Sequence, residues 1–222
     1  MRVVIAGGHG QIALHLERLL SEHGDQPVGL VRNADHADDL ADAGAETAVV
    51  DLESDTVETL ADILAGADAA VFAAGAGPNS GVERKKTVDL GGAILLANAC
   101  EVAGVRRLVV ISSIGTERAD TMDDSDGSGE QNVMKVYLQA KAAADEFVRG
   151  TELDWTVIRP GSLTDDPPTG EVTAAEHVDR AQIPRADVAA VVYAALHDDS
   201  TIGKQFEVVG GDTPVAEALA AL

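Results

Sequence analysis

Cysteine, long apolar runs and basic side chains are all scarce in this chain of 222 residues. The only cysteine, Cys100, lies in an apolar helical pattern, so no intramolecular disulfide can form and the thiol is predicted to be buried. The N-terminal apolar run from Val3 to Ala6 is too short for the core of a signal peptide. No stretch approaches the roughly 18 apolar residues of a membrane span. These absences predict a cytoplasmic protein without a membrane segment.

Basic residues number 16 against 38 acidic ones, which gives a net charge of −22. Such an acidic chain is repelled by nucleic acid and by anionic membranes, so neither is expected as a partner. The acidic residues are scattered rather than gathered in a tail, and only 5 of the basic residues are lysines. High net charge keeps a protein soluble and is a property that halophiles use. The composition favours adaptation to high salt, and an unusually acidic mesophilic protein is the alternative.

Strand-like and helix-like segments alternate along the chain. Strands are predicted at 2–6, 27–31, 46–50, 68–75, 105–113, 153–161 and 204–211, and helices at 10–24, 34–44, 57–66, 87–104, 131–150 and 185–199, with a last short helix after them. The strands are continuous apolar runs, as expected for strands that are covered on both faces. This alternation predicts an α/β fold, a doubly wound parallel sheet with helices on both faces and no linker that splits the chain.

The turn between the first strand and the first helix is predicted to bind a pyrophosphate. Its spacing is G-x-x-G-x-x-A, with Gly7, Gly10 and Ala13. At such a turn the backbone N–H groups and the positive helix end face the anion, and glycines let it come close. The alternative is an ordinary glycine turn. His9 is expected to be a loop residue near the phosphates rather than a catalyst.

The end of the second strand indicates which dinucleotide binds. An acid there would accept hydrogen bonds from the ribose hydroxyls of NAD, but the strand ends in Val31 and Arg32. An arginine can pair with a 2′-phosphate, so NADP is favoured over NAD, although Arg32 could also be a solvated surface residue. Asp51, after the third strand, either meets the adenine or caps the next helix.

Three further residues could carry chemistry. Tyr137 and Lys141 lie four residues apart in a predicted helix, and therefore one turn apart on the same face. Ser113 ends the fifth strand, where it could donate a hydrogen bond to a substrate carbonyl or only satisfy the backbone. The tyrosine and lysine could equally be exposed neighbours on a surface helix.

Three polar loops are expected to form the walls of a substrate pocket, at 76–86, 115–131 and 161–172. The acidic loop at 115–131 contains "DDSDG", which hints at a calcium site. Placing Gly127 as the glycine of an EF-hand loop would put Met122 at the first ligand position, so the spacing fails. No metal site is predicted.

The chain resembles the short-chain dehydrogenase/reductase superfamily, in its atypical branch of small NAD(P)H-binding proteins, often called NmrA-like or NAD-dependent epimerase/dehydratase. The resemblance covers nearly the whole chain and is specific in the order and spacing of its motifs. They are "IAGGHGQIALHL", "VRN", "DL", "VFAAGAG", "AGVRRLVVISSIGT", "YLQAKAAADEFVRGTELDWTVIRPG" and "TIGKQFEVVGGDTP". The resemblance implies one Rossmann-type NAD(P)-binding domain over 1–222, with a small substrate-side portion in about 161–222.

The resemblance also implies roles for individual residues. Cofactor contacts would fall on Gly7, Gly10, Gln11, Ile12, Arg32, Asp51 and Leu52, with Ala73, Ala74 and Gly75 lining the adenosine ribose. Ser113 would polarise the substrate carbonyl, and Tyr137 would exchange a proton with the substrate oxygen. Lys141 would hold the nicotinamide ribose and favour the tyrosinate.

Two functions follow from the resemblance. The first is an NADP(H)-dependent oxidoreductase that transfers a hydride to or from a small carbonyl or quinone-like substrate. The alternative is a non-catalytic NADP(H)-binding sensor that passes its redox state to a partner. Only residues 162–222 follow the motif "RPG", and they must also supply a strand and two helices, so a nucleotide-sugar substrate is not expected.

Overall fold

The centre of the molecule is a nine-stranded sheet with the order β11-β8-β10-β6-β5-β4-β1-β2-β3. The computed structural model describes residues 1–77, 80–125 and 131–222. Seven strands are parallel: β1 (Arg2–Ala6), β2 (Gln26–Val31), β3 (Glu46–Val49), β4 (Ala69–Phe72), β5 (Arg107–Ile111), β6 (Asp154–Pro160) and β10 (Lys204–Gly210). Two more pair in the antiparallel sense at one end, β8 (Glu171–Ala175) with β10 and β11 (Thr213–Pro214) with β8. The mostly parallel, doubly wound sheet that the sequence predicts is confirmed.

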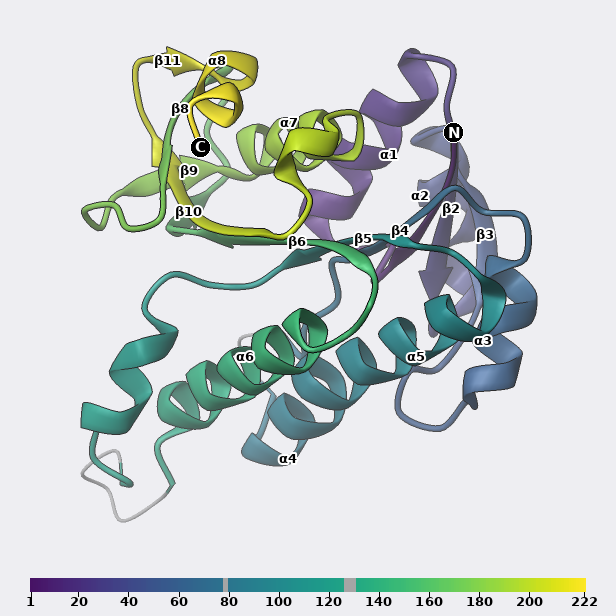
Figure 1. The fold of residues 1–222 in the computed structure, drawn as a ribbon. Helices are drawn as coiled ribbons and strands as arrows, with labels where there is room; N and C mark the ends of the chain where they lie inside the picture. Colours follow the sequence, from purple (N-terminus) through teal and green to yellow (C-terminus); the bar gives the residue numbers. More distant parts are fainter. Residues whose placement is uncertain (78–79, 126–130) are drawn as a thin grey trace.

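Helices cover both faces of this sheet (Figure 1). One face carries α1 (Gln11–Glu22), α7 (Arg185–Leu196) and α8 (Val215–Ala220), and the other carries α3 (Val57–Leu64), α5 (Ala93–Ala103) and α6 (Val133–Arg149). The short α2 (Ala37–Asp42) lies beside α1 and β3. The short α4 (Val82–Arg84) leads through a π-helical segment, Lys85–Gly92, into α5.

The apolar core is divided by the sheet into two layers. In β1, Val4 and Ala6 belong to the layer under α3, α5 and α6, whereas Val3 and Ile5 belong to the layer under α1, α7 and α8. All four side chains are fully buried. Successive side chains of a strand point to opposite faces, so a strand buried on both sides has to be apolar at every position.

The strand order reverses between β1 and β4, which are neighbours in the sheet. The chain runs outward from β1 through β2 to β3 on one side, and from β4 through β5 and β6 to β10 on the other. In open α/β sheets a crevice forms at the carboxyl ends of the strands where the order reverses. The turns after β1 and β4 therefore define where a ligand can enter the sheet.

The segment after β6 differs from the prediction. Residues 161–172, expected to be a loop, include β7 (Ser162–Thr164), which pairs with β9 (Gln182–Pro184), and the start of β8. The loop at 115–131 contains a 3₁₀ helix, Thr116–Thr121, and residues 126–130 of it lie outside the described residues, as do 78–79 of the loop at 76–86. The described residues hold no cluster of His, Cys, Asp or Glu that could bind a metal ion.

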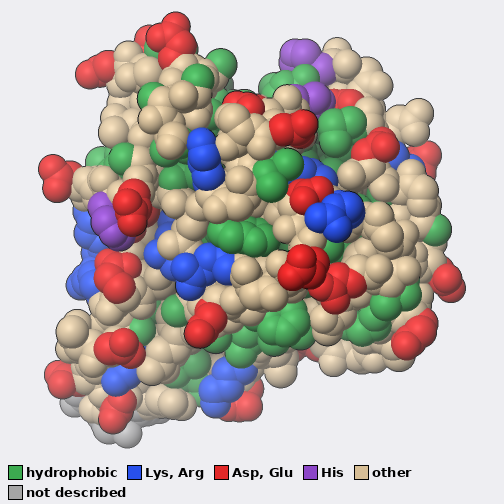
Figure 2. Space-filling view, in the orientation of Figure 1, with side chains coloured by type: hydrophobic (Ala, Val, Ile, Leu, Met, Phe, Trp, Pro, Cys, Tyr) green, Lys and Arg blue, Asp and Glu red, His purple; other side chains and the backbone are tan. Residues whose placement is uncertain are grey.

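No helix in the described ranges is both long and apolar enough to cross a membrane. Acidic side chains are spread over the whole face drawn in Figure 2 and form no single patch on it. Their mutual repulsion opposes the compact state, and salt reduces that repulsion.

We therefore expect the melting temperature to rise steeply with KCl up to molar concentrations. The Debye length is roughly 30 Å at 0.01 M salt and about 3 Å at 1 M, so the repulsion reaches across the molecule only at low salt. Thermal unfolding followed by circular dichroism across a KCl series is the measurement. A melting temperature that is flat or falls with KCl would remove the inference of adaptation to high salt.

Candidate functional site

The turn after β1 is shaped to admit a ligand close to the backbone. Gly7 has a φ of +84°, and a Cβ atom added to it would lie 2.6 Å from the Cα of Ala74. The N–H of Gly10 donates to the carbonyl of Gly7 at 2.8 Å, and Gly10 precedes α1 without any side-chain cap. The first N–H groups of the helix, including those of Gln11 and Ile12, therefore remain free to bind an anion.

A cleft of about 520 Å³ opens from this turn along the carboxyl ends of β1 to β4. Its lining is Gly7, His9, Gly10, Leu30, Val31, Arg32, Asn33, His36, Val50, Asp51, Leu52, Glu53, Ala73, Ala74, Gly75, Arg84 and Val88. We call it the cofactor cleft. Eight residues that the resemblance implies for the cofactor lie on this wall: Gly7, Gly10, Arg32, Asp51, Leu52, Ala73, Ala74 and Gly75.

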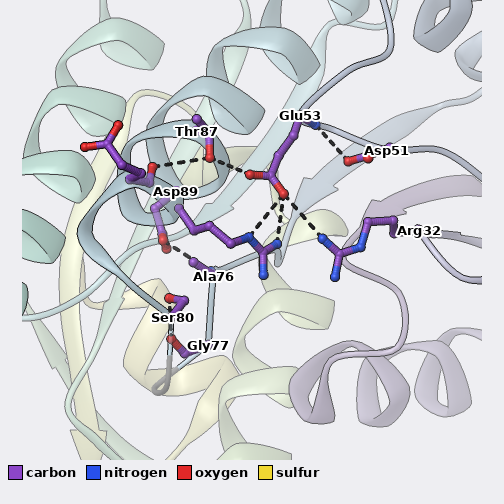
Figure 3. A network of polar contacts seen from close by, with 10 residues as sticks. Arg32, Asp51, Glu53, Ala76, Gly77, Ser80, Thr87 and Asp89 are labelled. Carbon is purple, nitrogen blue, oxygen red and sulfur yellow. Dashed lines mark hydrogen bonds and ion pairs between the residues drawn. The ribbon is translucent and has the colours of Figure 1, made fainter.

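Arg32 reaches the cleft beside a carboxylate that the sequence did not reveal. Glu53 accepts from Arg32 at 3.4 Å and from Arg84 at 3.0 and 3.2 Å, all on one oxygen (Figure 3). The hydroxyl of Thr87 donates to its other oxygen. That hydrogen bond, and then the two guanidinium groups, hold the pKa of Glu53 below its usual value. Two cations therefore face the outer end of the cofactor cleft, with one carboxylate between them.

Asp51, His9 and His36 also line the cofactor cleft. The carboxylate of Asp51 accepts from the N–H of Glu53 at 3.0 Å, whereas the cap of α3 is Thr56. Of the two readings of Asp51, the helix cap is therefore wrong, and the adenine contact stays a prediction. The ring of His9 stacks on that of His36 with centroids 3.7 Å apart, and its Nε2 lies 2.8 Å from Asp39.

A buried ionic cluster lies beneath the turn after β4. Asp89 accepts from the N–H of Ala76 at 3.2 Å and lies 3.7 Å from the ammonium of Lys141. Lys141, whose side chain is only 5% exposed, also donates to the carbonyl of Ile111 at 3.0 Å. Lys141 thus stands on the wall of neither cleft described here, and its contact with a nicotinamide ribose stays a prediction.

A second lysine lies against the predicted catalytic tyrosine. The ammonium of Lys85 is 5.2 Å from the ring centroid of Tyr137 and donates to the carbonyl of Gly77 at 2.7 Å. Burial lowers the pKa of Lys85, and the nearby Asp89 opposes that shift. Lys85 begins the π-helical segment, a type of distortion that is frequent at functional sites. In the sequence, the only feature that could have drawn attention to Lys85 is its pairing with Lys86 in a polar stretch.

The second cleft, of about 370 Å³, opens at the carboxyl ends of β5 and β6, and we call it the substrate-side cleft. Its lining is Ser113, Ile114, Arg118, Met122, Met134, Tyr137, Leu138, Gly161, Ser162 and Arg180. Ser113 and Tyr137, which come from different elements, therefore share one wall. Among the described residues, the hydroxyl of Ser113 makes one hydrogen bond, a long one of 3.3 Å to the carbonyl of Ile114.

The neighbouring Ser112 has a structural role. It donates to Asp145 at 2.9 Å, and Asp145 pairs with Arg159 at 2.8 Å, so the end of β5 is tied to α6 and β6. Asp145 is fully buried, and burial raises its pKa although Arg159 opposes the shift. This buried pair fixes α6, and with α6 the position of Tyr137.

A buried acid, Glu17, lies against the first turn. Glu17 of α1 has no exposed surface, and neither oxygen of its carboxyl group has a hydrogen-bond partner among the residues that the structure describes. A Cβ atom on Gly8 or on Gly29 would come within 3.0 or 2.6 Å of its Oε1, so both glycines leave room for it. Burial raises the pKa of Glu17 to about 8, so the group is largely protonated at neutral pH.

Comparisons with known proteins show which family model and which relatives this chain matches. A family model described as NAD(P)H-binding matches residues 7–199. The uncharacterized sugar epimerase YhfK of Bacillus subtilis is 34% identical over 99% of both chains. A solved structure from Bacillus halodurans, provisionally described as an NAD-dependent epimerase/dehydratase, is 37% identical over 100% of both chains, with a TM-score of 0.90. The oxidoreductase ylbE of Lactococcus lactis is 28% identical over 100% of this chain and 96% of its own, with a TM-score of 0.84.

Proposed function

This chain belongs to the NAD(P)H-binding family, and from that premise we propose that it is an NADPH-dependent reductase of small carbonyl or quinone-like compounds. The observation that carries the proposal is that Ser113 and Tyr137 share the wall of the substrate-side cleft. That cleft lies at the carboxyl ends of β5 and β6, and β5 is the neighbour of β4, whose carboxyl end borders the cofactor cleft. A hydroxyl pair beside a dinucleotide crevice suits carbonyl reduction.

The residues present fit a dinucleotide. A side chain at Gly7 would overlap Ala74, so the backbone there is bare, and the uncapped start of α1 suits a pyrophosphate. Arg32 and Arg84 would bind a 2′-phosphate, which would replace Glu53 as their anionic partner. When bound, NADPH supplies the hydride.

The chain's own residues supply the proton and the orientation. Tyr137 would donate its hydroxyl proton to the substrate oxygen as negative charge develops there. Ser113, whose hydroxyl makes a long hydrogen bond of 3.3 Å to Ile114, can turn to donate to the same oxygen. Lys85 holds the tyrosine ring from one side. The buried pair of Asp145 and Arg159 keeps α6 in place during the reaction.

A sensor without turnover is the second candidate, and the position of Lys141 favours it. Its ammonium is bound by Ile111 and Asp89 inside the protein rather than displayed in a cleft. NADPH consumption on a panel of small aldehydes, ketones and quinones at molar KCl separates the two functions. Substrate-dependent oxidation supports the reductase, whereas tight NADPH binding with no reaction on the panel supports the sensor.

The Arg32→Ala variant is expected to lose its preference for NADPH over NADH. A charge-assisted hydrogen bond contributes about 1.5–3 kcal/mol, so NADPH affinity should fall roughly 10- to 150-fold, while NADH affinity changes little. Calorimetric titration of both cofactors into the wild type and the variant is the measurement.

Arg106→Ala is the matched control, because Arg106 is an exposed arginine that pairs with Asp154 outside both clefts. It should leave both affinities unchanged. The assignment of NADP fails if the wild type prefers NADH, or if Arg32→Ala keeps the wild-type preference.

A further inference from the structure

Two arginines lie side by side in the substrate-side cleft. Arg118 comes from the 3₁₀ helix after β5, and Arg180 from the segment before β9. Both cover Gly115. A Cβ atom placed on that glycine would lie 3.0 Å from Nη2 of Arg180 and 3.5 Å from Cδ of Arg118. Gly115 has a φ of +81°, so the chain turns there in a conformation that leaves room for both side chains.

Arg118 and Arg180 form a local cluster of positive charge in a chain that is strongly acidic overall. Within the described part of the chain, neither Arg118 nor Arg180 pairs with a carboxylate, although the protein has 38 acidic and only 16 basic residues. Five of the other nine arginines do have acidic partners: Arg32 and Arg84 on Glu53, Arg106 on Asp154, Arg159 on Asp145 and Arg185 on Asp165. Two neighbouring cations without a counter-ion repel each other, and an anion placed against both would remove that cost.

The other residues that line the substrate-side cleft indicate what kind of molecule would carry the anionic group. Ile114, Met122, Met134 and Leu138 give the cleft an apolar side, and Ser113 and Tyr137 give it a pair of hydroxyls. A ligand that satisfies the whole wall has an apolar body, an oxygen that meets the hydroxyls and an anionic group that meets the arginines. Guanidinium groups bind a planar carboxylate through two parallel hydrogen bonds.

We propose that the substrate-side cleft binds an organic carboxylate, held by Arg118 and Arg180, whose reducible carbonyl faces Tyr137. The arginines thus select acidic substrates and place the carbonyl next to the tyrosine. This inference rests on the proposed function in one respect, that the cleft is the substrate site. Binding of the carboxylate does not depend on turnover, so the two can be tested separately.

The test is a comparison of naphthoate with naphthamide, which share a shape and differ in charge. Both are titrated by calorimetry into the protein saturated with NADP⁺, at one fixed KCl concentration. We expect naphthoate to bind at least about ten-fold more tightly, because charged hydrogen bonds to arginine are lost in the amide. The double variant Arg118→Gln, Arg180→Gln should bind the two ligands equally. Both side chains are exposed, so the fold should persist, and an unchanged melting temperature checks this.

Arg149→Gln is the matched control, because Arg149 is an exposed arginine at the end of α6 that lines neither cleft. It should keep the preference for naphthoate. The proposal is overturned if the wild type binds naphthoate and naphthamide equally, or if the double variant keeps the wild-type preference. It is also overturned if phenyl phosphate binds more tightly than naphthoate.

A second arm separates this proposal from the proposed function. Formylbenzoate and formylbenzamide are offered as substrates with NADPH. Faster reduction of the acid, abolished in the double variant, supports both proposals. Equal reduction of the two keeps the reductase and overturns the carboxylate site. A preference for naphthoate in binding, with no reduction of either aldehyde, supports the carboxylate site and counts against the reductase.

Discussion

Replacing Tyr137 by phenylalanine is expected to lower kcat by about 10²–10⁴-fold, the usual contribution of general acid–base catalysis, with little change in NADPH affinity. The variant keeps the ring that packs against Lys85 and the helix that carries it, and loses only the exchangeable proton. Single-turnover NADPH oxidation on small aldehydes, ketones and quinones at molar KCl measures the effect.

Tyr193→Phe is the matched control. Tyr193, the only other tyrosine, belongs to α7 and packs between His23 and His197 on the other face of the sheet. Removing its hydroxyl should leave the rate unchanged. If the wild type reduces a substrate and Tyr137→Phe matches its rate, Tyr137 is not the proton donor, and the tyrosine serves in binding or packing.

Replacing Glu17 by glutamine is expected to stabilise the protein in alkaline solution and to have little effect in acid. The folded-state pKa of Glu17, about 8, lies above the unfolded value of 4.5. Its contribution to stability is therefore fully present below pH 4.5 and is lost as the pH rises through about 8. Glutamine is neutral throughout, so the stability difference between variant and wild type should grow from near zero to about 3–5 kcal/mol at high pH.

Urea unfolding at several pH values, for both proteins at one KCl concentration, measures this difference. Glu22→Gln controls for the general effect of removing one negative charge, because Glu22 is exposed at the end of the same helix. Its effect should stay within about 0.5 kcal/mol at every pH. A Glu17→Gln difference that does not change with pH would show that the carboxyl is ionised in the fold.

The sequence predicted those features that depend on local pattern. Continuous apolar runs identified the seven parallel strands, and the spacing of Gly7 and Gly10 placed the turn after β1 at the crevice. The segment that forms β8 was not predicted as a strand, because it is short, follows Pro167 and Pro168, and mixes apolar with polar residues. Pairing with β10, far along the chain, rather than local propensity makes it a strand.

Features made by distant residues were not predictable in the same way. Glu53 meets Arg32 across 21 positions of sequence, and no local motif indicates that contact. The role expected of Lys141, from its position one turn from Tyr137 and from the family resemblance, stays a prediction, but a helix spacing does not show which neighbours bury a side chain. The buried Asp89, which comes from another helix, holds Lys141 inside the protein.

The two ends of the sheet bear on how the protein behaves at high concentration. A long, flat edge strand presents unpaired N–H and C=O groups, on which another chain can add as a further strand. Here one edge is β3, of 4 residues and beginning with the exposed Glu46, and the other is β11, of 2 residues and ending in Pro214, which has no N–H to donate. Molar salt screens the acidic surface that keeps molecules apart, so short edges become the remaining safeguard against aggregation by strand pairing.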